Sequence, residues 1–281
     1  MPNVVLVKDI LTWLDERAPF RFKASWDRCG LQVGDPEAGI ERVLVALDPS
    51  SVSLSEAEKL GCDCLVTHHP LLFHALYSVR LDELPGNLIA KVLRKSIHLI
   101  AAHTNLDVAR DGTNDQLARL LLLRDLEALD VDGSLQDESQ YGGMGRVGLL
   151  PGPVPLEALV ESAQRALGIQ GARVVGDRRK QVHRVALCTG SGGGLIEKAI
   201  SSGSQVYITG DVKYHEAQRA MEAGLALIDV GHFASERIVV QPVVEYLRSR
   251  AAQENVELEV LAAGEESDPF WIYHGEAIDG S

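Results

Sequence analysis

Apolar residues recur at helical spacing over residues 4–18, and Pro19 ends this pattern. Residues 43–47 and 62–67 are instead short, uninterrupted apolar runs. Such runs are typical of strands that are buried on both faces of a parallel sheet. The pattern therefore predicts one amphipathic helix followed by two buried strands.

The stretch between these two runs carries the start and stop signals of a helix. Ser53-Leu54-Ser55-Glu56 fits a capping box, in which the serine and glutamate side chains each accept a hydrogen bond from a backbone amide. Gly61 stands where a helix C-terminus favours a residue that tolerates positive φ. Strand, helix, strand is the repeating unit of a parallel α/β sheet.

The same alternation continues to residue 261. Residues 126–145 are acidic and rich in glycine, and we take them as the boundary between two lobes. We predict an α/β fold of two similar lobes with mostly parallel sheets, the first formed by residues 1–127 with 232–281 and the second by residues 128–231. The further predicted elements are helices near 86–96, 113–124, 155–167, 194–202, 213–223 and 234–250, and strands near 97–102, 146–150, 182–187, 205–209, 225–230 and 256–261.

Parts of the chain repeat. Residues 61–67 align with residues 203–209, and a histidine stands four positions before a carboxylate both at 103–107 and at 232–236. Each of these two pairs follows an apolar strand. Shared α/β patterning can explain a match between apolar strands, but apolar burial requires neither a histidine nor a carboxylate. Ligand sites in parallel α/β sheets lie at the carboxyl ends of strands, where both pairs are predicted to stand.

Two adjacent histidines, His68 and His69, follow the strand predicted over 62–67. If the chain turns there, the two imidazoles diverge, which suits one histidine to each of two nearby metal ions. Pro70 restricts His69 to an extended backbone and holds that arrangement. A pair of exposed loop histidines is the alternative, but the apolar residues 71–73 favour a buried loop, where imidazoles need partners.

The two repeated pairs supply further candidate ligands. Side chains four positions apart on a helix can reach one ion, which suits His232 and Glu236 because a helix is predicted from residue 234. A loop is favoured for His103 and Asp107, since a glycine follows closely. Imidazoles mixed with carboxylates are typical ligands of zinc, iron, manganese or cobalt, and a carboxylate can bridge two ions. We expect two divalent metal cations.

Asp211 occupies the position in the second repeat that His69 fills in the first, and it stands four residues before His215. This pair could support the metal ligands or transfer protons. An exposed helix start with an aspartate near its cap explains the same residues equally well.

A glycine-rich segment at residues 189–194 follows a predicted strand and opens a predicted helix. Backbone amides in such a segment could bind an anion. The segment lacks the Lys-Ser/Thr ending of a P-loop and the full spacing of a dinucleotide-binding loop. Anion binding is therefore one interpretation of these glycines.

Composition limits the partners. The formal charge is −13, from 27 basic and 40 acidic side chains, which argues against bulk nucleic-acid or anionic-membrane binding. No apolar run reaches the roughly 18 to 20 residues that span a bilayer, and the N-terminus does not have the pattern of a signal peptide. The four cysteines, Cys29, Cys62, Cys64 and Cys188, lack paired spacing and are predicted to be reduced thiols of a cytoplasmic protein.

Six motifs occur in order along the chain: Trp26-Asp27, Gly30-Leu31-Gln32-Val33-Gly34, Thr67-His68-His69-Pro70, His103 to Asp107, Gly210-Asp211 with His215, and Gly231-His232 with Glu236. Together these motifs resemble the Nif-three-like dinuclear metal-centre proteins, also described as GTP cyclohydrolase 1 type 2 homologues. The resemblance extends from about residue 5 to residue 250.

The resemblance implies two divalent cations between two α/β lobes, and a ring-shaped homohexamer whose sites face an internal cavity. By position it places the metal ligands at His68, His69, Asp107, His232 and Glu236. It also implies that His103 lies beside the metals, as a supporting group or as a ligand in one state.

Two functions follow from these observations. The first is a metal-dependent hydrolase that acts on a nucleotide-like or phosphorylated small molecule, because paired ions activate water and polarise a substrate. The second is a non-enzymatic protein that stores, delivers or senses divalent cations, or serves as a scaffold. The sequence contains no Gly-x-Ser-x-Gly motif and no cysteine placed as a nucleophile, which favours metal-activated water as the chemistry.

Overall fold

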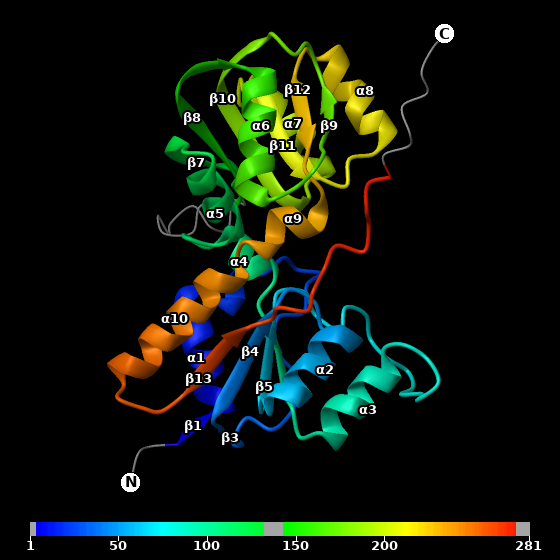
Figure 1. The fold of residues 1–281 in the computed structure, drawn as a ribbon, viewed down its shortest axis with the longest axis vertical. Helices are drawn as coiled ribbons and strands as arrows, with labels where there is room; N and C mark the ends of the chain where they lie inside the picture. Colours follow the sequence, from blue (N-terminus) through cyan, green and yellow to red (C-terminus); the bar gives the residue numbers. More distant parts are fainter. Residues whose placement is uncertain (1–3, 132–142, 274–281) are drawn as a thin grey trace.

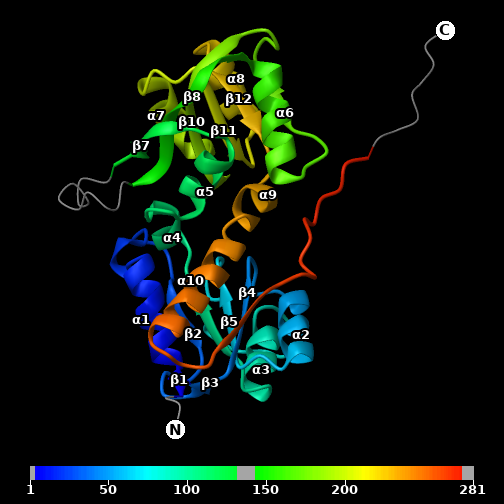
Figure 2. The ribbon, with the colours of Figure 1, turned by 60° about the vertical axis from the view of Figure 1, so that its left-hand side comes forward.

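The structure, a computed structural model, describes residues 4–131 and 143–273 and consists of two α/β lobes (Figure 1). The first lobe is built on a five-stranded sheet and the second on a six-stranded sheet. The short helices α4 (Thr104–Val108) and α9 (His232–Arg237) lie between the two sheets in both ribbon views (Figure 1, Figure 2). The predicted α/β class with two lobes is confirmed.

The sheet of the first lobe is mostly parallel. Its strands, in spatial order, are β13 (Glu259–Ala262), β4 (Arg42–Ala46), β5 (Cys64–Thr67), β6 (His98–Ala101) and β2 (Gly30–Val33). Only the outer strand β2 runs antiparallel to its neighbour, β6. The carboxyl ends of β4, β5 and β6 therefore meet at the edge of the sheet that faces the second lobe.

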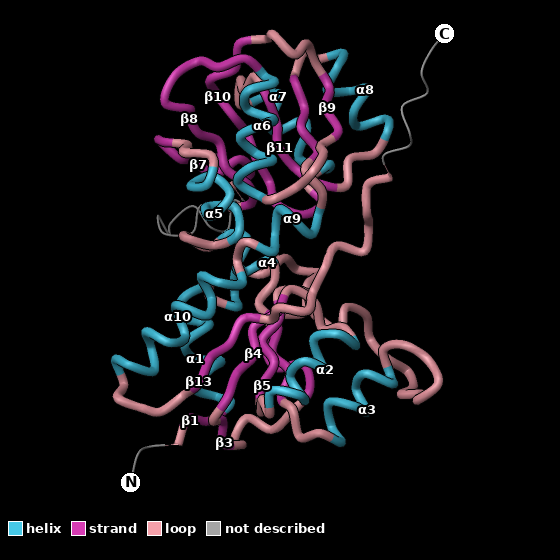
Figure 3. The backbone as a smooth tube through the Cα atoms, viewed as in Figure 1, coloured by secondary structure: helices cyan, strands magenta, loops and turns pink. Residues whose placement is uncertain are grey.

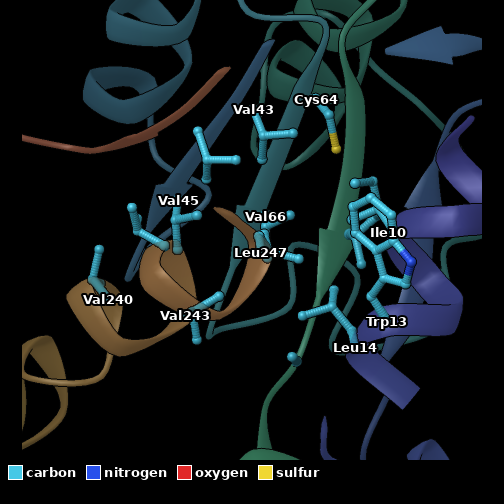
Figure 4. Packing of buried hydrophobic residues seen from close by; sticks show 14 of the residues in the cluster. Ile10, Trp13, Leu14, Val43, Val45, Cys64, Val66, Val240, Val243 and Leu247 are labelled. Atoms are coloured by element: carbon cyan, nitrogen blue, oxygen red, sulfur yellow. The ribbon is translucent and has the colours of Figure 1, made fainter. Parts of the chain in front are cut away.

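Helices cover both faces of this sheet. Helices α1 (Val7–Arg17) and α10 (Val240–Gln253) pack on one face, where Ile10 and Leu247 contact the core around Val45 (Figure 4). Helices α2 (Ser51–Leu60) and α3 (Gly86–Arg94) pack on the other face. A two-stranded sheet, β1 (Val5–Leu6) with β3 (Gly39–Ile40), joins α1 to this lobe.

Strand β4 shows why these runs are apolar at every position. Val43 and Val45 point to the face covered by α1 and α10, whereas Leu44 and Ala46 point to the face covered by α2 and α3. Successive strand residues point to opposite faces, so a strand covered on both sides needs apolar residues throughout. Complete burial of one valine or leucine side chain contributes about 1.5–3 kcal/mol.

The sheet of the second lobe is mixed rather than mostly parallel. Its strands, in spatial order, are β7 (Arg124–Asp130), β8 (Met144–Pro155), β10 (Gln181–Ser191), β11 (Val206–Gly210), β12 (Ala226–Asp229) and β9 (Arg173–Val175). The three strands β10, β11 and β12 are parallel, and the outer pairings are antiparallel. The helices of this lobe are α5 (Thr113–Leu120), α6 (Leu156–Leu167), α7 (Ile196–Ser201) and α8 (Tyr214–Glu222).

The region expected to separate the lobes differs from the prediction. Residues 124–130 form strand β7, and the helix predicted to reach residue 124 ends at Leu120. Leu117 of α5 packs in the core of the six-stranded sheet, N-terminal to the boundary expected at residue 127. The part of the expected boundary at residues 132–142 lies outside the described residues.

Two helix predictions need correction. Ser50 caps α2, because its hydroxyl accepts a hydrogen bond from the Ser53 amide (3.2 Å). Glu56, expected in the capping box, instead accepts a hydrogen bond from the Gly264 amide (2.8 Å). Gly61 ends the helix in the left-handed conformation, with φ of 66°, as predicted.

The single helix expected over residues 234–250 is two helices, α9 and α10. Pro242 has no N–H to donate to the carbonyl of Ile238, and its ring crowds that carbonyl. The break lets α9 belong to the inter-lobe region while α10 packs on the first sheet (Figure 2).

Across residues 4–131 and 143–273, none of the helices combines the length and apolar character that a bilayer crossing demands.

Candidate metal centre

His68 and His69 leave the end of β5 at the inter-lobe edge of the first sheet. The Thr67 hydroxyl donates a hydrogen bond to the carbonyl oxygen of His69 (2.7 Å), which fixes the turn after the strand. The two ring centroids lie 5.1 Å apart with an angle of 47° between the ring planes. The two rings are tilted against each other, but both direct Nε2 toward Glu236, His68 to Oε1 and His69 to Oε2, rather than in diverging directions.

Four histidines gather at this edge, and each is held through its Nδ1 atom. A histidine fixed in this way presents Nε2 to a metal ion, and such outer contacts set the tautomer and the ring orientation. The Nδ1 partners are the Ala102 carbonyl oxygen for His68 (2.9 Å), Asp48 Oδ1 for His69 (2.7 Å), Asp27 Oδ1 for His103 (2.9 Å) and Asp211 Oδ2 for His232 (2.7 Å).

Glu236 lies at the middle of the cluster and is almost completely buried. Its Oε2 atom is 2.9 Å from the Nε2 atoms of both His69 and His232, and its Oε1 atom is 3.8 Å from Nε2 of His68. His232 and Glu236 share one face of α9, as their spacing predicted. Oε2 of Glu236 thus faces His69 and His232, whereas Oε1 faces His68.

Asp107 approaches His68 from α4, with its Oδ1 atom 3.5 Å from Nε2 of His68. The prediction of a loop here was wrong, because α4 is a helix. Its first turn is capped from a distance: the carboxylate of Asp27 accepts a hydrogen bond from the Thr104 amide (3.0 Å). The hydroxyl of Thr113 donates to Asp107 and orients that carboxylate.

Three groups of these side chains could hold a metal ion, and in each group the potential ligand atoms lie within 4.8 Å of one another. Glu236 belongs to two of the groups. The groups are His68 with Asp107 and Glu236, His69 with His232 and Glu236, and His68 with His69 and His103.

The chemistry of the cluster fits a cation. Nε2 of His68 is buried and has no hydrogen-bond partner in the described residues. A buried polar atom without a partner is costly, and a metal ion would satisfy it. Two buried carboxylates, Asp107 and Glu236, surround the same space and would neutralise part of the charge of a cation.

The protonation of the metal-free cluster also indicates a site for a cation. Burial opposes the charged form of Glu236, but hydrogen bonds from His232 and His69, together with the charge of the neighbouring His68 imidazole, outweigh it and hold its pKa well below the usual range. Burial also opposes protonation of His69, but hydrogen bonds to Asp48 and Glu236 raise its pKa to about 10. Protons on these imidazoles thus occupy the place that a cation would take.

His232 behaves similarly, because its hydrogen bond to Glu236 raises its pKa to about 9. Burial dominates at Asp107 and raises its pKa. Burial also raises the pKa of the Cys29 thiol to about 12, and a hydrogen bond to Asp27 adds to the shift. All four cysteines are free thiols in the structure, as predicted.

Asp211 and His215 do not form the pair considered from the sequence. Asp211 bonds to His232, whereas His215 is exposed on α8 and its Nδ1 lies 3.3 Å from Oε1 of Gln218. His215 belongs to none of the three candidate groups found among the described residues. The alternative of an exposed helix start describes His215 better.

Sequence reasoning missed two aspartates that orient histidines. Asp48 stands two residues after the end of β4, so the rule that ligands stand at the carboxyl ends of strands could have found it. Asp27 entered only as part of a motif, and nothing in its local sequence signals a contact with His103, which stands 76 positions away.

The glycine-rich segment lies against the metal cluster, and two of its amides already donate hydrogen bonds within the protein. The Gly190 amide donates to the Ser235 hydroxyl (2.9 Å), and the Gly192 amide donates to the Thr209 hydroxyl (3.0 Å). A Cβ atom at Gly190 would lie 1.9 Å from Oε1 of Glu236. The absence of a side chain at residue 190 therefore makes room for the central carboxylate.

A cavity of about 1080 Å³ borders the cluster. His69 and His232 line it, together with their carboxylate partners Asp48 and Asp211. Part of the opposite wall is the C-terminal segment at residues 268–272. A small molecule in this cavity would lie against the two histidines.

This chain is similar to known proteins both in sequence and in structure. The family described as Duf34/NIF3 (NGG1p interacting factor 3) matches residues 5–269. A "GTP cyclohydrolase 1 type 2 homolog" from Clostridium acetobutylicum is 32% identical over 264 residues, which are 94% of this chain and 97% of that protein. A protein of the same name from Streptomyces coelicolor is 36% identical over 233 residues, which are 82% and 81% of the two chains.

Two solved structures are also similar to this chain. A Bacillus cereus protein related to NIF3 superimposes with a TM-score of 0.89 at 25% identity, covering 96% of this chain and 100% of that one. Reduced HcgD from Methanocaldococcus jannaschii superimposes with a TM-score of 0.78 at 29% identity, covering 93% and 99%. The similarity extends over both lobes.

Proposed function

This chain belongs to the Duf34/NIF3 family, and on that premise we propose that it binds two divalent cations and uses them to hydrolyse a nucleotide-like or phosphorylated small molecule. The described cluster contains three groups of side chains that are able to hold a metal ion.

One observation carries the proposal: Glu236 presents one carboxylate oxygen to His69 and His232 and the other to His68. This arrangement supports one ion held by His68, Asp107 and Glu236, and a second held by His69, His232 and Glu236. A shared carboxylate between two nitrogen-containing ligand sets is a common feature of dinuclear centres. The mixture of imidazole and carboxylate favours zinc, iron, manganese or cobalt over calcium or magnesium.

When bound, two such cations supply Lewis acidity and lower the pKa of coordinated water. The protein's own residues contribute orientation, because each Nδ1 contact fixes one imidazole with Nε2 toward the cluster. Among the described residues, His103 forms no hydrogen bond or ion pair with Glu236, and Asp27 holds it at one edge of the cluster. It is therefore the imidazole best placed to hold or transfer a proton.

The relatives' name, GTP cyclohydrolase 1 type 2 homolog, and the size of the adjacent cavity support a nucleotide-like substrate. Ligand cavities of this order hold small organic molecules and bury most of their surface. The cavity reaches both His69 and His232, so a bound molecule would meet the proposed centre directly.

We also propose the ring-shaped homohexamer that the family resemblance implies. The loop between β5 and α3 exposes the apolar side chains of Leu76, Tyr77, Val79, Leu81 and Leu84. A grouped exposure of this kind is typical of protein contact surfaces. Light scattering coupled to size-exclusion chromatography tests the assembly, and a monomeric mass would contradict it.

Metal content and turnover test the proposed function. Mass spectrometry of the purified chain should find two metal equivalents, and Glu236→Gln should retain fewer than one. Glu245→Gln, an exposed substitution on α10, should retain two. The metal-loaded protein should then hydrolyse at least one compound in a nucleotide and phosphoester panel. The metal-handling function would be favoured instead if the protein contained two metal equivalents, released them readily to a chelator at neutral pH, and hydrolysed none of these compounds.

A further inference from the structure

Helix α4, which carries Asp107, is too short to hold its position alone. It consists of five residues, and all five are buried. Isolated helices of this length are unstable in water, because few hydrogen bonds form within them. The helix lies between the two sheets (Figure 3), so contacts with neighbouring elements must fix it. Asp27 fixes its first turn by accepting a hydrogen bond from the Thr104 amide.

Arg146, on strand β8 of the second lobe, fixes the other end of α4. Its Nη2 atom donates hydrogen bonds to the carbonyl oxygens of Val108 (3.3 Å) and Ala109 (3.2 Å), at the end of the helix. The last carbonyls of a helix have no partner within it, and their partial negative charge favours a nearby cation. Arg146 therefore stabilises the end of α4 that carries Asp107.

The guanidinium of Arg146 is itself held in place. It is almost completely buried, and its Nε atom donates to the carboxylate of Asp115 in the first turn of α5. Its Nη1 atom donates to the carbonyl oxygens of Gly143 (2.7 Å) and Gly145 (2.8 Å). Because Asp115 balances its charge, Arg146 adds little net positive charge near the proposed cations. Its contribution to the metal centre is therefore one of geometry.

Asp107 receives two further contacts that also place it relative to the second lobe. The Thr113 hydroxyl donates to its carboxylate, and the Asn114 side-chain amide donates to its backbone carbonyl (2.9 Å). Asn114 in turn accepts a hydrogen bond from the Thr189 amide on β10 (2.9 Å). His68, by contrast, leaves the sheet of the first lobe. The position of α4 between the lobes therefore decides whether Asp107 reaches His68.

We propose that Arg146 is a positioning residue for the metal ion held by His68, Asp107 and Glu236. By holding α4 against β8, it keeps the carboxylate of Asp107 beside Nε2 of His68. The printed hydrogen bonds of Arg146 within the described residues go to Asp115 and to backbone carbonyls, so it acts through the backbone next to Asp107. The inference rests on the proposed function, because it concerns one of the two proposed metal sites.

Arg146→Lys in the full chain loaded with zinc tests this inference. Lysine keeps the charge, but its single ammonium group cannot replace a planar guanidinium that donates from three nitrogens at once. The site that contains His68 and Asp107 should lose about 10- to 100-fold in zinc affinity, as when an outer contact of a metal ligand is removed. The site that contains His69 and His232 should keep its affinity. Chelator competition with separate determination of the two equivalents measures both.

A second variant guards against a failure to fold. Arg146→Met/Asp115→Leu replaces the buried ion pair by apolar side chains, an exchange that often leaves stability unchanged because no buried charge loses its partner. It removes the hydrogen bonds to the end of α4 just as Arg146→Lys does. The same selective loss of zinc affinity at the site of His68 and Asp107 is expected.

A double-variant cycle separates positioning from a general loss of stability. If Arg146 acts through Asp107, Arg146→Lys should cause little further loss of zinc affinity in a chain that already carries Asp107→Asn. Arg184→Lys is the matched control, because Arg184 lies on the neighbouring strand β10 and donates to the carbonyl of Ser202 (3.0 Å) rather than to α4. It should bind zinc as the unmodified chain does.

Three results would overturn the inference: equal loss of affinity at both sites, unchanged affinity at the site of His68 and Asp107, or independent, additive losses in the cycle. The test also separates this inference from the proposed function. Selective loss at one site without hydrolysis of any compound would leave the role of Arg146 standing and remove the hydrolase. Hydrolysis by a chain whose two zinc affinities ignore both Arg146 variants would leave the hydrolase standing and remove the role of Arg146. A chain that binds no zinc would remove both.

Discussion

Nδ1 of His69 lies 2.7 Å from Oδ1 of Asp48, which joins the residues that follow two neighbouring strands, β5 and β4. The same imidazole directs Nε2 to Glu236 at 2.9 Å. Asp48 therefore orients a candidate metal ligand without touching the central carboxylate itself. The C-terminal segment that follows β13 is attached at Asp48 as well, because the carboxylate of Glu266 accepts a hydrogen bond from the Asp48 amide.

Asp48→Asn should weaken the metal site that contains His69 by about 10- to 100-fold, because outer contacts of metal-binding histidines have effects of this size. The site that contains His68 and Asp107 should keep its metal. Chelator competition with separate determination of the two equivalents measures this difference. Asp82→Asn, in an exposed loop, is the control and should change neither site. Equal loss of both metals in Asp48→Asn would contradict the assignment.

Gly190→Ala should disrupt metal binding by displacing Glu236. The new Cβ would lie 1.9 Å from Oε1 of that carboxylate, and residue 190 has a φ of +67° that L side chains rarely adopt. The strain should lower the free energy of unfolding by about 1–3 kcal/mol. Denaturant unfolding and metal analysis measure the two effects. Gly194→Ala meets no atom within 4 Å and should change neither quantity; normal metal content in Gly190→Ala would count against this packing.

Metal affinity should rise with pH between about 6.5 and 10. In the metal-free protein the pKa of His69 is about 10 and that of His232 about 9, so a cation must displace protons from both imidazoles at neutral pH. Calorimetry in buffers of different ionisation enthalpy should detect proton release on metal binding. Proton uptake on metal binding, or a metal affinity that does not change with pH, would contradict this prediction.

The stability of the metal-free protein should change in the opposite direction. The raised histidine pKa values stabilise the fold fully below about 6.5, the value of an unperturbed histidine, and this contribution is lost as the pH rises through about 9 to 10. Thermal unfolding of chelator-treated protein across this window should show a decline. Glu236→Gln should reduce the decline, because it removes a partner common to both histidines.

Asp27→Asn should lower the free energy of unfolding by about 1–3 kcal/mol, because Asp27 is fully buried and accepts hydrogen bonds that an amide nitrogen cannot accept. Burial raises the pKa of Asp27, but hydrogen bonds from His103 and Thr104 outweigh it and lower the pKa below its usual range. Asp125→Asn, an exposed substitution, is the control. Unfolding in denaturant measures both variants, and equal stability would contradict the role of Asp27.

The sequence predicted those parts of the centre that depend on local patterns. His68 and His69 stand at a strand end, and His232 and Glu236 share a helix face, so strand ends and helical spacing were sufficient to identify them. The same reasoning would have reached Asp48. The mixed second sheet was harder, because the pattern of an outer antiparallel strand such as β7 resembles that of a loop when most of its residues are exposed.

The remaining features depend on contacts between distant residues. Helix α4 has no capping residue of its own, and its cap comes from Asp27, 77 positions before Thr104. The contact of Gly190 with Glu236 likewise joins the two lobes. Local propensity contains no record of such pairings, which is why the prediction of a loop at Asp107 was wrong.

The central claim is that two cations share Glu236, and a crystal structure of the metal-loaded chain with anomalous scattering tests it most directly. The account predicts two anomalous peaks on either side of the Glu236 carboxylate, one beside His68 and Asp107 and the other beside His69 and His232. A single peak, or peaks away from Glu236, would contradict it.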